Sequence, residues 1–164
     1  CDRRQRQMCI RDRIFREVLN RKPNAKLFLI GDGPLKDEIM KNVSDIRKSV
    51  IFVGTVDNVN DYMQAMDIMV LPSLFEGLPL VAIEWQINGL PSLLSNTITE
   101  DCNITNMVRF ESLEEAPYIW TNDILEMLEK ENRLENSQKA ISLVRKNGFD
   151  IYDNAKILEK IYKS

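Results

Sequence analysis

The sequence predicts an α/β fold: a Rossmann-like, doubly wound parallel sheet, with helices after it at the C-terminal end. Short apolar runs alternate with stretches of helical spacing along the chain. The runs are apolar almost throughout, which is typical of strands buried on both faces of a parallel sheet. Crossover connections between such strands are right-handed, and this favours the doubly wound arrangement.

The elements follow in a regular order. The first helix is expected from Ile14, with a stripe of apolar residues that Pro23 ends. Another helix is expected over Pro79 to Asn88, with Gly89 as its stop. Strands are expected at residues 25–30, 50–54, 67–73, 91–96 and 107–112. The other helices are expected at residues 35–46, 59–66, 118–132, 134–147 and 150–163.

Composition excludes several classes of function. The net charge is −3 and the pI is near 5.2, which argues against a nucleic-acid-binding surface. No apolar run has the length of a membrane span, so any membrane contact is expected to be peripheral at most. Three cysteines without paired or metal-like spacing indicate a reducing, cytoplasmic compartment. There is no histidine, which removes histidine-based triads and most zinc sites.

The first thirteen residues differ from the rest. "CDRRQRQMCIRDR" is dense in charge and has no clear apolar period. Its second half, residues 8–13, resembles a translated transposon-end adapter of the kind used in sequencing libraries. We therefore expect residues 1–13 to be non-native or disordered, or else the ragged start of the first helix, and residues 14–164 to form one Rossmann-like domain.

Ligands of doubly wound sheets bind beyond the carboxyl ends of the strands. The loops expected there lie at residues 31–34, 54–58, 72–79 and 95–101. Gly31 and Gly33 would let the backbone approach a ligand closely. This signal is weak alone, because Gly-Asp-Gly-Pro is also a common turn between a strand and a helix.

Two carboxylates stand out in "LPSLFEGLPLVAIEWQINGLP", residues 71–91. Glu76 precedes the expected helix, and Glu84 follows on it about 12 Å further along, at ~1.5 Å per residue. Glycosidase carboxylates lie only about 5–9.5 Å apart, so this spacing better fits one extended ligand held at two points. The alternative is that Glu76 is a cap and Glu84 a solvated helix residue. The apolar neighbours of Glu84 favour the ligand, because a solvated carboxylate is less expected among them.

Several segments in the right order resemble GT-B glycosyltransferases of family 4. "PSLFEGLPLVAIEWQINGLP" is similar to their E-x7-E segment, and residues 27–39 and 51–73 are similar to the segments that precede it. "SNTITED" and "ITNMVRF" resemble a branch that builds bacterial capsular polysaccharide or exopolysaccharide. The resemblance implies the donor-binding half of a retaining glycosyltransferase. Such an enzyme transfers a hexose from a nucleotide-sugar, here expected to be a UDP-sugar, without a metal or other cofactor.

The resemblance also implies roles for single residues. Glu76 would be the catalytic residue that holds the donor sugar, and Glu84 would accept hydrogen bonds from the ribose hydroxyls. The other donor-binding positions that it implies are Gly77, Pro79, Leu80 and Val81 near the diphosphate, Gly54 and Val56 beside the base, and Gly31 and Gly33 along the cleft. No metal site is expected, since the sequence has no Asp-x-Asp pair.

The resemblance further implies that an N-terminal, acceptor-binding domain is missing. The chain alone is therefore expected to be inactive, and its parent to act on a glycan or lipid-linked glycan, peripherally at the inner membrane face. Two alternatives stay open: a fragment of a nucleotide-sugar epimerase of the same architecture, and a nucleotide-binding module without catalysis. An epimerase would be expected to use histidine or extra carboxylates. A receiver-like module would need an acidic cluster after its first strand.

Overall fold

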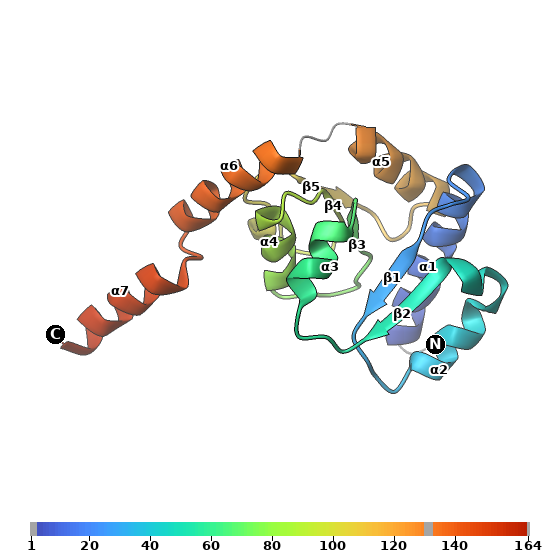
Figure 1. Cartoon of the computed structure of the whole chain (residues 1–164), viewed down its shortest axis with the longest axis horizontal. Coiled ribbons are helices and arrows are strands. Elements are labelled where there is room, and N and C mark those ends of the chain that lie inside the picture. The colour runs from blue at the N-terminus through green and yellow to red at the C-terminus, as the bar shows by residue number, and fades with distance from the viewer. Residues whose placement is uncertain (1–2, 130–132, 164) are drawn as a thin grey trace.

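In the computed structural model, which describes residues 3–129 and 133–163, parallel strands lie between two layers of helices (Figure 1). Strands β3 (Met69–Leu71), β4 (Ser92–Ser95) and β5 (Val108–Glu111) form one parallel sheet in the order β3-β4-β5. Strands β1 (Leu27–Ile30) and β2 (Val50–Gly54) form a second parallel pair. The α/β class and all five strands are thus confirmed.

The strands are divided between two hydrogen-bonded ladders, although the sequence predicts one sheet. Among the described residues, no ladder joins β1 to β3. A single apolar cluster nevertheless spans both ladders: Val50 of β2 and Leu93 of β4 belong to it, together with Trp120. The two ladders therefore share one core layer.

Strand β4 has helices on both of its faces, because successive side chains of a strand point to opposite sides. Leu93 packs in the cluster formed with α1 (Arg3–Arg21) and α5 (Pro117–Glu129). Leu94 packs in a second cluster with Met63 of α3 (Val59–Ala65) and Trp85 of α4 (Leu80–Ile87). Trp85 is thus a core residue.

Helix α1 begins earlier than predicted. Residues 3–13, expected to be non-native or disordered, are helical and continuous with the segment from Ile14. Residues 1–2 lie outside the described part of the chain. Whether residues 1–13 are native stays a prediction, because a helical conformation does not reveal where a segment comes from.

The expected helix at 35–46 is divided into α2 (Lys36–Asn42) and the 3₁₀ segment η1 (Ser44–Ser49). A further 3₁₀ turn, η2 (Glu100–Cys102), follows β4. Among the described residues, no helix is both long and apolar enough to cross a membrane.

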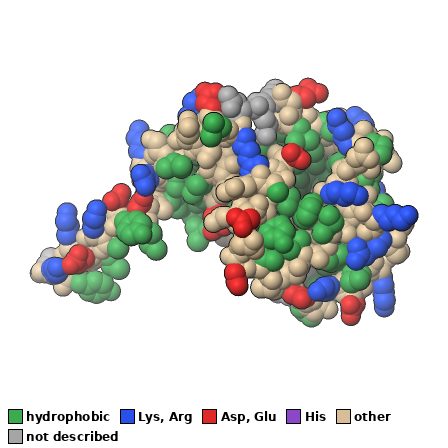
Figure 2. Space-filling view, viewed as in Figure 1, with side chains coloured by type: hydrophobic (Ala, Val, Ile, Leu, Met, Phe, Trp, Pro, Cys, Tyr) green, Lys and Arg blue, Asp and Glu red, His purple; other side chains and the backbone are tan. Residues whose placement is uncertain are grey.

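The last two helices leave the body of the molecule. Helix α6 (Arg133–Lys146) packs on α4, and α7 (Ile151–Lys163) then projects beyond it (Figure 1). Every residue of α7 is exposed. Hydrophobic side chains gather along one side of this projection and lysines along the other (Figure 2). The helix is thus amphipathic, and its apolar side has no covering in the described structure.

Candidate functional site at the carboxyl ends of the strands

The glycines that end β1 and β2 lie together. The Gly31 amide donates a hydrogen bond to the Gly54 carbonyl at 2.8 Å. Both residues have positive φ, 120° at Gly31 and 80° at Gly54, and a Cβ at either would meet no atom within 4 Å. Backbone conformation and not crowding therefore explains these glycines. The space above them is open, as a ligand cleft would require.

The turn after Gly31 is held by its own side chains. Asp32 accepts hydrogen bonds from the Gly33 amide at 2.8 Å and from Lys36 at 3.1 Å. The Lys36 ammonium, followed by the Gly33 amide, lowers the pKa of Asp32 below its ordinary value. Gly33 itself is exposed. Val56, the remaining residue predicted near the base, is half-buried in the loop between β2 and α3.

The loop between β3 and α4 carries Glu76 at the same edge. Glu76 is half-buried, and Gly77 after it is exposed. Two large apolar side chains flank them at the surface, Phe75 with 65% exposure and Leu78 with 42%. Exposed apolar side chains thus lie on both sides of Glu76 in the sequence of this loop.

Helix α4 begins one residue later than predicted. Pro79 is buried and takes the N-cap position in an extended conformation, so the helix starts at Leu80. The Ala82 amide bonds to the Pro79 carbonyl at 2.9 Å, which places Leu80 and Val81 before the first intrahelical hydrogen bond. Their side chains are exposed, 61% at Leu80 and 38% at Val81. The helix therefore presents two amide donors and the positive end of its dipole at this edge.

Glu84 is exposed, although its apolar neighbours in the sequence made a solvated carboxylate less expected. Residues 83 and 85 are buried because a turn of 100° per residue points them to the core while position 84 points outward. Glu84 borders a hollow of about 480 Å³ between α3 and α4, whose lining residues are Asp57, Val59, Asn60, Met63, Glu84, Ile87 and Asn88. An exposed carboxylate beside this hollow can accept hydrogen bonds from a ligand.

The hollow is supported from behind by Arg133, a residue that the sequence reasoning missed. Its guanidinium donates to the carbonyls of Met63 and Asn88, the latter at 3.1 Å, and both of these residues line the hollow. It also donates to the carbonyls of Gln64 at 2.7 Å and Met66 at 2.8 Å. One cation thus joins the C-terminal ends of α3 and α4. No sequence pattern marks it, because all of its partners are backbone atoms distant along the chain.

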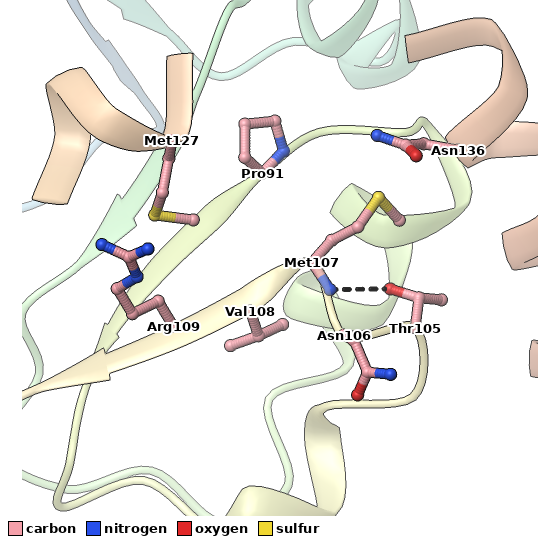
Figure 3. Close-up of a pocket in the computed structure, with 8 residues that line it drawn as sticks. All are labelled: Pro91, Thr105, Asn106, Met107, Val108, Arg109, Met127 and Asn136. Carbon is pink, nitrogen blue, oxygen red and sulfur yellow. Dashed lines mark hydrogen bonds between the residues drawn. The ribbon is translucent and has the colours of Figure 1, made fainter. Parts of the chain in front are cut away.

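A second hollow, of about 360 Å³, lies at the opposite edge of the sheet, where β4 and β5 begin (Figure 3). Pro91, Met107 and Val108 line it with Met127 of α5 and Asn136 of α6. Arg109 at its side pairs with Asp123 at 2.6 Å and Glu126 at 3.0 Å. No residue predicted for donor binding lies there. Across residues 9–129 and 133–163, no cluster of three acidic or cysteine side chains could hold a metal.

Comparison with known proteins decides the family. The family model described as "Glycosyl transferases group 1" matches residues 3–129. The chain belongs to this glycosyltransferase family. The match covers the strands, the glycine loops and both glutamates.

The similar proteins are larger than this glycosyltransferase-family chain. EpsF of Bacillus subtilis (strain 168), by name a glycosyltransferase, is 39% identical over 103 residues, 60% of this chain and 27% of EpsF. The capsular polysaccharide biosynthesis glycosyltransferase CapH of Staphylococcus aureus is 26% identical over 156 residues, 90% of this chain and 42% of CapH. The chain therefore spans well under two thirds of these relatives.

A solved structure shows the same fold. The crystal structure of TarM superimposes with a TM-score of 0.68 at 20% identity, over 94% of this chain and 31% of TarM. The crystal structure of WaaG, by its title a glycosyltransferase involved in lipopolysaccharide biosynthesis, also superimposes with a TM-score of 0.68, at 19% identity over 87% of this chain and 40% of WaaG. At such low identity, structural similarity establishes the fold of this chain but not its substrate or mechanism.

Proposed function

We propose that this chain is the donor-binding part of a retaining, metal-independent, family 4 glycosyltransferase that transfers a hexose from a UDP-sugar during bacterial polysaccharide or capsule synthesis. The observation that carries the proposal is the arrangement on α4. The amides of Leu80 and Val81 open the helix, and the exposed carboxylate of Glu84 lies about one turn further on.

The arrangement suits the two chemically different parts of a nucleotide diphosphate. Amide donors and a helix dipole bind a diphosphate, and they stabilise the charge that develops on it as the leaving group departs. A carboxylate is an acceptor only, and the two hydroxyls of a ribose are matching donors. The base would lie by Gly54 and Val56, with Gly31, Gly33, Gly77 and Pro79 shaping the cleft.

Glu76 would hold the donor sugar and orient its reacting carbon. The acceptor would be a glycan or lipid-linked glycan, bound by parts of the parent protein outside this chain. The apolar side of α7 would pack on those parts, and the parent would work at the cytoplasmic face of the membrane. We propose that the chain alone transfers no sugar, because a GT-B cleft is formed between two domains. Sugar transfer from UDP-glucose or UDP-galactose by the chain alone would contradict this.

Calorimetric titration of UDP into the 164-residue chain tests the donor site. Wild-type binding is expected with a Kd of about 0.1–1 mM, or roughly 4–5.5 kcal/mol. Glu84→Ala should weaken it at least about tenfold, since a hydrogen bond to a charged acceptor contributes about 1.5–3 kcal/mol. Glu129→Ala is the matched control, because Glu129 is an exposed glutamate at the end of α5. GDP and ADP, titrated in parallel, report the choice of base.

Each outcome has a separate meaning. UDP binding that is lost in Glu84→Ala and kept in Glu129→Ala supports the proposal. Equal binding by wild type and Glu84→Ala would remove the ribose role from Glu84. No binding of any nucleotide diphosphate by the wild type would contradict a donor site formed by this chain alone.

A further inference from the structure

The pairing of β3 with β4 stops where the Glu76 loop begins. The last paired residues are Leu71 and Leu94. The residue after β3 is Pro72, which has no amide hydrogen to donate to the ladder. The loop that carries Glu76 must therefore be held by something other than backbone pairing.

Two hydroxyls of the neighbouring strand end supply that connection. The Ser73 carbonyl accepts a short hydrogen bond from the Ser95 hydroxyl and a second from the Thr97 hydroxyl at 2.8 Å. Both lone pairs of this carbonyl are thus occupied. The Ser73 hydroxyl in turn donates to the Phe75 carbonyl at 3.2 Å, which closes a tight turn immediately before Glu76.

The Ser95 half of this connection is buried, whereas Thr97 is exposed. Ser95 is fully buried and Ser73 is 2% exposed, so water has little access to replace their hydrogen bond. A buried carbonyl that loses its donor carries the desolvation cost of an unmade hydrogen bond. Beyond this turn, by contrast, Phe75 is largely exposed. The backbone just before Glu76 is thus tied to β4, while the residues on either side of Glu76 lie at the surface.

We propose that Ser95 and Thr97 are positioning residues for Glu76, and that they set the sugar end of the donor site separately from its nucleotide end. The inference rests on the proposed function, because it takes Glu76 as the group that holds the donor sugar. The nucleotide end depends on α4 and Glu84, whereas both hydroxyls donate to the Ser73 carbonyl in the loop before Glu76. Loss of the hydroxyls should therefore impair recognition of the sugar and leave recognition of UDP intact.

The loop connection is tested first without any ligand, by hydrogen exchange read by mass spectrometry. Thr97→Val removes one hydroxyl at nearly constant shape, and Thr97→Ser keeps it. Ser95→Ala removes the buried hydroxyl. Ser92→Ala is the matched control, since Ser92 is equally buried on β4 but its hydroxyl bonds to Leu90 at the other end of the strand. Amides of residues 74–78 should exchange about five- to tenfold faster in Ser95→Ala and Thr97→Val only.

The functional part is tested by calorimetric titration of UDP, UDP-glucose and UDP-galactose into the same variants. In the wild type at least one UDP-sugar should bind more tightly than UDP. In Ser95→Ala and Thr97→Val this preference should fall about fivefold or more, with UDP affinity unchanged within about twofold. Thr97→Ser should retain it.

The results separate this inference from the proposed function. If wild type binds no UDP, the proposed donor site fails, whereas the exchange experiment still decides whether the hydroxyls hold the loop. Equal weakening of UDP and UDP-sugars in Ser95→Ala would mean a general structural role and would overturn the proposal. So would the same behaviour of Thr97→Val and Thr97→Ser, or a wild type that binds UDP and both UDP-sugars equally.

Discussion

Gly89 lies directly against the backbone of Arg133: a Cβ on Gly89 would come within 2.4 Å of the Arg133 carbonyl oxygen. Gly89 also has a φ of 70°, and it ends α4 in a Schellman motif with bonds from Gly89 to Gln86 and from Leu90 to Trp85. Helix α6 can therefore reach α4 only because this position has no side chain.

Replacement of this glycine should be costly. Gly89→Ala combines a left-handed conformation with a backbone clash, so we expect it to lower the free energy of unfolding by about 2–4 kcal/mol in urea titrations. Gly33→Ala is the control, since a Cβ there meets nothing within 4 Å and its φ is not positive. It should change stability by less than about 0.5 kcal/mol. Equal effects of the two substitutions would contradict the close contact.

Arg133 should be poorly replaced even by lysine. Its planar group donates to four carbonyls of α3, α4 and the residues that follow them, a geometry that a single ammonium cannot reproduce. Arg133→Lys should therefore cost about 1.5–3 kcal/mol of unfolding free energy. Lys139→Gln, which breaks an exposed pair with Glu135, should cost less than about 0.5 kcal/mol. Arg133→Lys at wild-type stability would show that the carbonyls are satisfied by other donors.

The two described cysteines should differ in reactivity. Burial raises the pKa of the Cys102 thiol, which also donates to the Thr99 carbonyl at 3.1 Å, whereas Cys9 is exposed. Iodoacetamide should modify Cys9 rapidly in the folded protein and Cys102 only as fast as the protein unfolds. Residue-resolved mass spectrometry measures both rates. Rapid modification of Cys102 in native buffer would contradict its burial.

The pair between Arg16 and Asp45 should make a small contribution that depends on pH. The hydrogen bond from Arg16, at 2.8 Å, lowers the pKa of Asp45. Stability from a lowered carboxyl pKa is present above the unfolded-state value of about 3.9 and disappears as the pH falls through the folded-state value. Arg16→Gln should raise the Asp45 pKa in carboxyl NMR titrations. Its loss of stability should be smaller at pH 3 than at pH 6. An unchanged Asp45 pKa in the variant would rule out the pair.

Helix α7 should contribute almost nothing to the stability of the body. All of its residues are exposed, Tyr162 by as much as 83%. Deletion of residues 151–164 should change the free energy of unfolding by less than about 0.5 kcal/mol, because no buried apolar surface is lost. It should also reduce binding of the dye ANS, which reports exposed apolar surface. A marked drop in stability would mean that α7 folds back onto the body in solution.

The fold was predictable from the chain because its strands are short apolar runs between helical periods, and that pattern is local. The division into two ladders was not predictable, since no local pattern encodes whether β1 and β3 pair, and among the described residues they do not. The start of α1 was also misplaced, because a charged segment with a weak apolar period can continue an existing helix at little cost.

The site residues likewise differ in how far the sequence could predict them. Positions that depend on backbone conformation, such as Gly31, Gly54 and Gly89, are visible in sequence because few residues besides glycine adopt positive φ readily. The exposure of Glu84 was misjudged, since neighbours in sequence lie on different faces of a helix. Arg133 and Ser95 act on carbonyl groups of distant segments, and every residue type has a carbonyl. Only the folded structure reveals such contacts.

The anchoring of the Ser73 carbonyl has a consequence for how this family could change its substrates. The hydroxyls that hold the loop come from the end of β4 and the turn after it, and not from the loop itself. Residues 74–78 can therefore be exchanged without touching the attachment. Evolution, or a combinatorial library, could reshape the proposed sugar end of the site there while the sheet and α4 stay as they are.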